Sequence, residues 1–387
     1  MPGGRQGNGS DPEAQSSGPL RYQADYENER RWLTIDLLMG RVDRSHMFHE
    51  RLVAAGASEA ELAEFVAEPC PPDIIGIDYY LTSDRFLDHR NALHPGEHLG
   101  GNLFDAYVDI AAVRSPYADR ATLAARIDEV WERYRLPLAL TEIHNGCTRD
   151  EQLRWLLESW ETACAARSKG VDLRALTAWA LCGMVDWNSM LTRCDRHYEP
   201  GAFDARCLPP RPTALSHAIA QLARGEAYDH PILDRPGWWR PDGHRRIPAR
   251  PLLLSGEGDM RGTIEECCKA RRVAFVGGDF RSTDHELPGT WPSIHVSPIW
   301  PGETWLRLNC RYADGCVLDI EAECAANRRC VADACLDLLI DDCQGRVRLL
   351  KVRAGNQYEL SVRSLERPNF CARPSVPPAL GVYVRHR

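Results

Sequence analysis

A glutamate that follows an apolar run is the residue of this sequence best placed for chemistry. Residues 136–146 read LPLALTEIHNG, so Glu142 stands at the C-terminal end of a segment that predicts a buried strand. In enzymes built as barrels of strands and helices, catalytic groups sit at that end of the strands. A retaining glycosidase needs one carboxylate as nucleophile and another as acid/base, about 5–5.5 Å apart. Taken alone, Glu142 fits a surface or helix-capping role better than a catalytic one.

Three apolar segments and one helix would hold this glutamate in place. The segments are predicted strands, buried on both faces of a parallel sheet because their apolar character is nearly continuous: Asp73–Tyr80, Leu136–Thr141 and Leu173–Leu181. A helix is expected over 149–168, with Thr148 and Glu151 as its capping box and Gly170 as its stop. Strands that alternate with helices predict an α/β fold.

The N-terminal part adds helices but no further strand. Residues 1–18 are rich in Gly, Ser, Gln and Pro, and we expect a disordered tail there. Residues 21–40 predict a helix, and a second helix over 58–67 begins at Ser58, with Glu61 completing a capping box.

A proline-rich stretch divides the chain. Residues 226–250 predict a linker, because proline breaks both helices and strands, and Trp238 and Trp239 are expected to clamp it onto a domain. The predicted domains are therefore 19–225 and 251–387.

Four segments of the first domain together resemble family 1 glycoside hydrolases. DIIGIDYY (73–80) resembles D-F-I-G-L-N-Y-Y, and LTEIHNG (140–146) resembles the nucleophile motif T-E-N-G with two residues inserted. DEQLRWL (150–156) resembles D-x-x-R-x-x-Y-L, and WALCGMVDW (179–187) resembles W-S-L-L-D-N-F-E-W. Order and spacing agree over about 21–225, and the resemblance implies part of a (β/α)8 TIM barrel.

The resemblance also implies roles for individual residues. Glu142 would be the nucleophile, and the Tyr80 hydroxyl would hydrogen-bond its carboxylate. Four residues would contact the sugar: Asp78 in an asparagine position, Asp186 in a glutamate position, and the rings of Trp179 and Trp187. For the two tryptophans, packing in the hydrophobic core is as good an interpretation as contact with a sugar.

The chain also departs from this family. It contains no N-E-P acid/base motif, and the first five barrel strands have no counterpart. About 200 residues with three recognisable strands cannot close a barrel. We therefore expect a carbohydrate-active protein with an incomplete active site; a sugar-nucleotide reductase and a non-catalytic sugar-binding fragment remain the alternatives.

The second domain opens with a glycine turn. PLLLSGEGDMRG (251–262) predicts a strand, a turn and a helix N-terminus, the arrangement that binds dinucleotides. With ACLDLLIDDCQG (334–345) it resembles dTDP-4-dehydrorhamnose reductase, which implies a truncated Rossmann-like segment with Gly256, Gly258 and Gly262 at the cofactor. Asp259 would repel a pyrophosphate there, and no Tyr-x-x-x-Lys pair exists. We therefore expect no cofactor, NAD(P) included, and no hydride transfer.

The composition of the chain limits the classes of partner that it can bind. The net charge is −8 and the arginines are scattered, which argues against nucleic acid. No apolar run approaches the roughly 20 residues of a membrane span, and no signal region is present, so we expect a cytoplasmic protein. The 15 cysteines include no CxxC pair, which predicts free thiols and no metal site. The expected partner is a carbohydrate or a sugar nucleotide.

Overall fold

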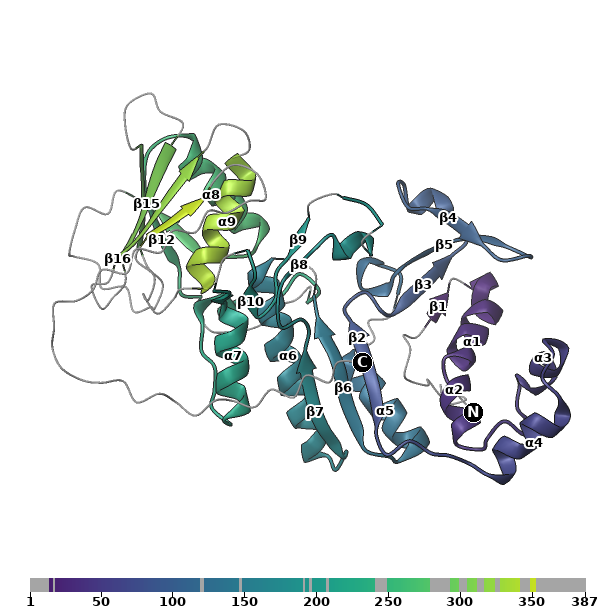
Figure 1. Cartoon of the computed structure of the whole chain (residues 1–387). Helices are drawn as coiled ribbons and strands as arrows, with labels where there is room; N and C mark the ends of the chain where they lie inside the picture. Colours follow the sequence, from purple (N-terminus) through teal and green to yellow (C-terminus); the bar gives the residue numbers. More distant parts are fainter. Residues whose placement is uncertain are drawn as a thin grey trace.

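A computed structural model shows an α/β protein in which several small sheets are packed with helices (Figure 1). It describes residues 14–16, 18–118, 122–145, 148–190, 192–194, 197–206, 209–240, 249–278, 293–298, 305–311, 317–323, 328–341 and 349–352. No sheet within these ranges closes into a barrel. None of the helices within them combines the length and apolarity needed to cross a bilayer.

The central sheet consists of three parallel strands in the order β2-β6-β7, which are Ile75–Tyr80, Leu138–His144 and Leu173–Ala178. The connections contain helix α5 (Leu123–Tyr134) and helix α6 (Arg149–Ser168). Buried residues of β2, such as Ile75 and Ile77, form one core with Ile127 of α5 and Trp155 of α6.

The other face of this sheet differs from the expectation that both faces are buried. Exposure alternates along β2, where Gly76 and Asp78 are exposed, and Thr141 and Thr177 of the neighbouring strands are exposed as well. The prediction was wrong because α5 and α6 cover one face only, and no described element covers the other. The uncovered face carries small and polar side chains.

The strand ends also differ from the prediction. Strand β6 continues to His144, three residues further than expected, and β7 ends at Ala178 rather than at Leu181. Helix α6 has the predicted bounds and Gly170 follows it with φ +94°, but the Thr148 side chain forms no capping hydrogen bond.

A second small sheet, in the order β1-β3-β5-β4, includes part of the predicted disordered tail. Strand β1 (Ala14–Ser16) pairs in parallel with β3 (Arg85–Asp88). Backbone pairing therefore orders these residues despite their polar composition, and the buried Leu20 anchors the segment that follows. The remaining strands are β5 (Ala106–Ala111) and β4 (Leu99–Gly101). Residues 1–13 and 17 of the predicted tail lie outside the described ranges.

The predicted N-terminal helix is divided in two. Helices α1 (Arg21–Arg30) and α2 (Leu33–Leu38) are separated at Trp32, whose side chain is fully buried. Helix α4 (Glu59–Ala67) is confirmed, and its Ser58–Glu61 capping box is formed in both directions. The remaining short elements before residue 214 are η1 (Gly18–Leu20), α3 (His49–Ala54), η2 (Asn91–Leu93), η3 (Ala112–Arg114), β8 (Met184–Val185), η4 (Trp187–Ser189), β9 (Tyr198–Glu199), β10 (Phe203–Asp204) and β11 (Arg211–Pro212).

The C-terminal half forms a six-stranded mixed sheet in the order β13-β12-β14-β15-β16-β17. Its strands are Phe275–Gly277, Leu252–Gly256, Ser293–Pro298, Trp305–Arg311, Val317–Glu323 and Leu349–Val352. Strand β12 lies parallel to both of its neighbours, and helix α8 (Asp259–Ala270) follows it, which confirms the predicted strand–turn–helix start. Helix α9 (Arg328–Asp341) packs beside α8.

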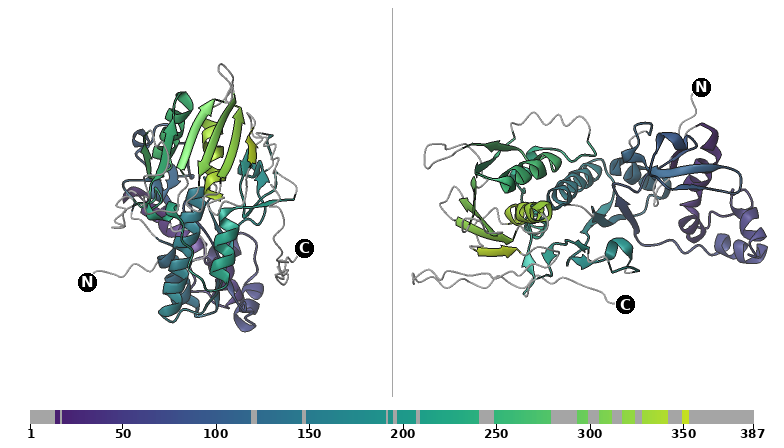
Figure 2. Two further views of the ribbon diagram at one scale, coloured as in Figure 1. Left: turned by 90° about the vertical axis from the view of Figure 1, so that its left-hand side faces the viewer. Right: turned by 90° about the horizontal axis from the view of Figure 1, so that it is seen from above.

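The two halves share one hydrophobic core. Leu153 and Leu156 of α6 belong to the same buried cluster as Leu252 and Leu254 of β12. Seen from above, α6 and α9 lie side by side between the central and C-terminal sheets (Figure 2). Helix α7 (Ala214–Ala223) packs against both helices.

The stretch predicted as a linker is largely packed. His230 is fully buried, and it precedes the 3-10 helix η5 (Pro231–Asp234), in which Ile232 is 2% exposed. As expected, Trp239 is clamped: its Nε1 donates to Glu158 of α6 at 3.0 Å. Over its described part this stretch is therefore no free linker, because its apolar residues enter the shared core. Residues 241–248 lie outside the described ranges.

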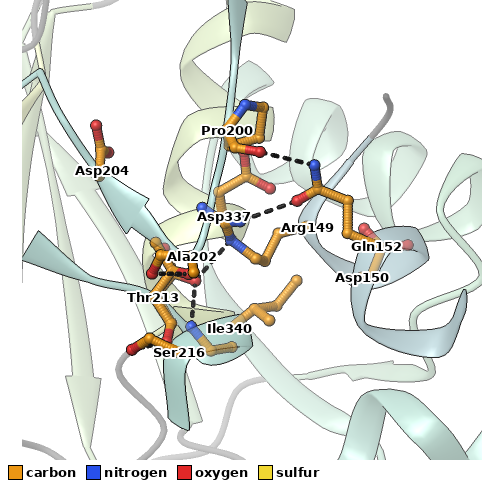
Figure 3. A network of polar contacts seen from close by, with 12 residues as sticks. Arg149, Asp150, Gln152, Pro200, Ala202, Asp204, Thr213, Ser216, Asp337 and Ile340 are labelled. Atoms are coloured by element: carbon orange, nitrogen blue, oxygen red, sulfur yellow. Dashed lines mark hydrogen bonds and ion pairs between the residues drawn. The ribbon is translucent and has the colours of Figure 1, made fainter. Parts of the chain in front are cut away.

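Buried charges reinforce the junction. Arg149, at the start of α6, donates to the Gln152 side chain (Figure 3). It also donates to the Gly201 carbonyl and forms an ion pair with Asp341 of α9. Arg271, just after α8, contacts Asp150 of α6 at 2.7 Å and Asp337 of α9 at 2.6 Å. Helices α6, α8 and α9 are thus joined by ion pairs that are largely shielded from water.

Candidate functional site

Tyr80 and Glu142 lie in contact at the C-terminal ends of neighbouring strands. Tyr80 ends β2, Glu142 stands near the end of β6, and the Tyr80 hydroxyl donates to Glu142 Oε2. This adjacency agrees with the strand order read from the sequence. Both residues are only partly buried.

The surroundings keep the Tyr80 phenol protonated. Burial raises the pKa of Tyr80 well above its ordinary value, and the hydrogen bond to Glu142 and the negative charge of that carboxylate raise it further. The charges of Asp78 and Glu199 act in the same direction. At physiological pH the phenol is therefore a permanent donor that orients the Glu142 carboxylate.

Asp78 lies on the exposed face beside this pair. Thr141 Oγ1 donates to Asp78 Oδ1 at 2.6 Å, which fixes the carboxylate across the two strands. Gly76 leaves room for this contact, because a Cβ there would lie 2.9 Å from two atoms of the Thr141 side chain. Asp78 is thus held next to Glu142, its register partner on β6.

The two predicted sugar-facing tryptophans lie together. The ring centroids of Trp179 and Trp187 are 5.5 Å apart, and Trp187 is 36% exposed. Asp186 is only 6% exposed, and its Oδ1 accepts a hydrogen bond from the His197 backbone N–H at 2.8 Å. The carboxylate of Asp186 therefore holds a local turn, and the exposed polar surface of the site comes from other residues.

Two residues of the site were missed from the sequence. The imidazole Nε2 of His144 contacts Glu199 Oε1, and the two residues are 7% and 9% exposed. The His144 ring meets Trp179 edge-on at 5.0 Å and Tyr80 edge-on at 6.3 Å. Together with the two tryptophans, His144 and Glu199 line a narrow hollow.

A sequence signal existed for one of these residues only. His144 stands two residues after Glu142, and residues i and i+2 of a strand share a face. Ending the strand at Thr141 concealed this relation. Glu199 lies in β9, a strand of two residues, which has no periodicity to detect.

The predicted cofactor glycines form a tight turn between β12 and α8. Gly256 has φ +99°, and a Cβ there would lie 2.0 Å from the Val296 carbonyl oxygen. Gly258 has φ +93° and precedes the helix, whereas Gly262 lies inside α8, where a Cβ would meet nothing within 4 Å. Asp259, the first residue of α8, forms an exposed ion pair with Arg328, so a carboxylate lies at the helix N-terminus where a pyrophosphate would bind.

Metal binding and disulfides find no support in the described ranges. No group of three or more His, Cys, Asp or Glu side chains there could hold a metal ion. Seven of the cysteines in these ranges are free thiols: Cys70, Cys164, Cys182, Cys194, Cys267, Cys268 and Cys335.

Comparison with known proteins adds little. No protein-family model matches the chain, and no curated protein matches it. Among solved structures, the chain is similar to the AHE enzyme from Alicyclobacillus herbarius, at 16% sequence identity and a TM-score of 0.35. That match covers 50% of this chain and 44% of the other, so this chain spans less than half the length of that enzyme.

Proposed function

We propose that this chain is a carbohydrate-active protein of the glycoside hydrolase type, in which Glu142 attacks the anomeric carbon of a glycoside. The observation that carries the proposal is the contact between the Tyr80 hydroxyl and the Glu142 carboxylate at the ends of two parallel strands. Groups at this edge of a parallel sheet converge on one site, as in barrel enzymes. The partner is a small carbohydrate or a sugar nucleotide.

The chemistry of the neighbours supports a nucleophile rather than a structural glutamate. Within the described ranges no arginine or lysine forms an ion pair with Glu142, and the group that donates to its carboxylate is a neutral phenol. A carboxylate held by one phenol keeps its other oxygen available for attack. The hydrogen bond from Tyr80 also fixes the direction in which that oxygen points.

The surroundings suit a pyranose. The Trp187 indole, which is 36% exposed and packs against Trp179, offers flat apolar surface of the kind that packs against a sugar ring. Asp78 offers a carboxylate oxygen as a hydrogen-bond acceptor for sugar hydroxyls, and it lies on the same exposed face.

The proposal is tested by hydrolysis of 2,4-dinitrophenyl β-glycosides of glucose, galactose and xylose, whose leaving group needs no proton. The wild-type chain is expected to release dinitrophenolate from at least one of them above background, and Glu142→Gln is expected to lose that activity. Glu132→Gln, which changes an exposed glutamate of α5, is the matched control and should behave as the wild type. Equal rates for the wild type and Glu142→Gln would refute the proposal.

A further inference from the structure

The group that supplies a proton to a leaving oxygen is the open chemical question of this site. A carboxylate nucleophile that forms a glycosyl ester needs a second group beside the glycosidic oxygen, which protonates that oxygen as it departs. The Tyr80 phenol holds its proton too tightly, because its pKa is raised. The Asp186 carboxylate is already engaged in a local turn, because its Oδ1 accepts a hydrogen bond from the His197 backbone N–H.

His144 is positioned differently. It lies two residues beyond Glu142 on the same strand, so both side chains leave β6 on the same face. The insertion of Ile143 and His144 into the T-E-N-G pattern is what brings this imidazole to the site. Histidine is also the side chain that ordinarily exchanges a proton near neutral pH.

We propose that His144, held by Glu199, is the proton donor and acceptor of this site, an inference that rests on the proposed function. Glu199 contacts Nε2, which fixes the orientation of the ring. Nδ1 is then the atom that exchanges protons with the substrate. The titratable groups that contact the ring or line the hollow with it are Tyr80 from β2, Glu199 from β9 and Cys182 after β7. Glu142 precedes His144 by two residues on β6.

The reaction balances with these groups. A Glu142 oxygen forms a bond to the anomeric carbon while the bond to the leaving oxygen breaks, and that oxygen takes the proton of the His144 imidazolium. In the second half, neutral His144 takes a proton from water as the water oxygen attacks the anomeric carbon. The bond to Glu142 breaks, and both residues return to their starting state with one water consumed.

The first test compares two leaving groups on the same sugar, the one that wild type accepts as its dinitrophenyl glycoside. For His144→Gln we expect turnover of the phenyl glycoside to fall by about 10²–10⁴-fold, the usual contribution of general acid catalysis. The initial burst of dinitrophenolate should remain equal to the enzyme concentration, since this leaving group needs no proton. His98→Gln, at an exposed histidine, is the matched control and should match wild type on both substrates.

The second test uses Glu199→Gln, which keeps the imidazole and removes the neighbouring charge. If Glu199 stabilises the imidazolium, the alkaline limb of the phenyl glycosidase pH profile moves down by about one pH unit or more. A purely structural role would lower the rate at all pH values and leave that midpoint in place.

The outcomes separate the two proposals. Equal activity of wild type and Glu142→Gln on the dinitrophenyl glycoside would defeat the proposed function itself. An inactive Glu142→Gln together with a His144→Gln that retains phenyl glycosidase activity within about threefold would overturn the role of His144 alone. If His144→Gln gives no burst because it fails to fold, an unshifted midpoint in Glu199→Gln overturns the inference, and a shifted one supports it.

Discussion

Side chains that meet in this protein come from distant parts of the sequence, and the sequence predicts some of these meetings better than others. Tyr80 and Glu142, 62 residues apart, were expected to touch because each ends a predicted parallel strand. The His144–Glu199 contact spans 55 residues and was not expected. It depends on the exact end of β6 and on a loop whose course leaves no pattern in the sequence.

The buried histidine of the predicted linker gives a pH dependence at the residue scale. Burial lowers the pKa of His230 to about 4, from an ordinary value of 6.5. Ile232 N–H donates to its Nδ1 at 3.0 Å, and the other ring nitrogen lies 3.2 Å from the Ile340 carbonyl. The folded protein therefore holds a neutral imidazole, whereas the unfolded chain takes up a proton as soon as the pH falls below about 6.5.

We predict that the stability contributed by neutral His230 is fully present above pH 6.5 and is lost as the pH falls from 6.5 to 4. The gap between these two pKa values corresponds to roughly 3 kcal/mol, at about 1.4 kcal/mol per pH unit. Urea unfolding at a series of pH values should give a flatter curve for His230→Asn than for wild type over this range. Parallel curves would show that His230 does not contribute.

Local patterns identified helices better than they identified buried faces. The Ser58–Glu61 capping box and the bounds of α6 were predicted from sequence alone, although the predicted Thr148 cap of α6 is not formed. The burial of the central sheet was not, because the apolar runs of β2 and β7 look two-sided although Gly76 and Thr177 face solvent. A short strand such as Ala14–Ser16 is formed by its pairing partner rather than by its own residues.

The glycine turn between β12 and α8 allows a matched pair of substitutions. Gly256→Ala should destabilise the protein by at least about 2 kcal/mol, because φ is +99° and the new methyl group would strike the Val296 backbone. Gly262→Ala should stabilise it by about 0.5–1 kcal/mol, since its position is open and helical. Chemical denaturation of both variants checks the prediction. Similar effects of the two substitutions would contradict the structure of this turn.

On the scale of the whole molecule, the two predicted domains are joined by a shared hydrophobic core and by buried ion pairs. Arg149, Asp150 and Arg154 open helix α6, and in a sequence such residues indicate a solvated face. In the structure all three are nearly or fully buried, because the C-terminal half supplies their partners. Single-sequence patterns contain no information on such pairing across about 120 residues.

We predict that this junction makes unfolding a single transition. Asp150, fully buried, accepts from Arg154 at 3.0 Å and pairs with Arg271 at 2.7 Å. Asp150→Ala removes the carboxylate that buried Arg154 pairs with, whereas Arg271 keeps Asp337, and the substitution should cost about 3–5 kcal/mol. The exposed pair of Asp172 and Arg174 is the control, and Asp172→Ala should leave the urea midpoint nearly unchanged, because solvent screens this pair. Circular dichroism and tryptophan fluorescence should report coincident urea transitions for the wild type. Two separate transitions would mean that the halves fold independently.

The central claim is that Glu142 is the nucleophile, and covalent trapping tests it most directly. A 2,4-dinitrophenyl 2-deoxy-2-fluoro-β-glycoside, made with the sugar that the wild type accepts, forms the glycosyl ester readily but hydrolyses slowly from it. Mass spectrometry of the intact chain and of its peptides is expected to find one fluorosugar per chain, on Glu142, and none on Glu142→Gln. A sugar attached to another residue, or dinitrophenolate release without any attached sugar, would contradict the assignment of Glu142.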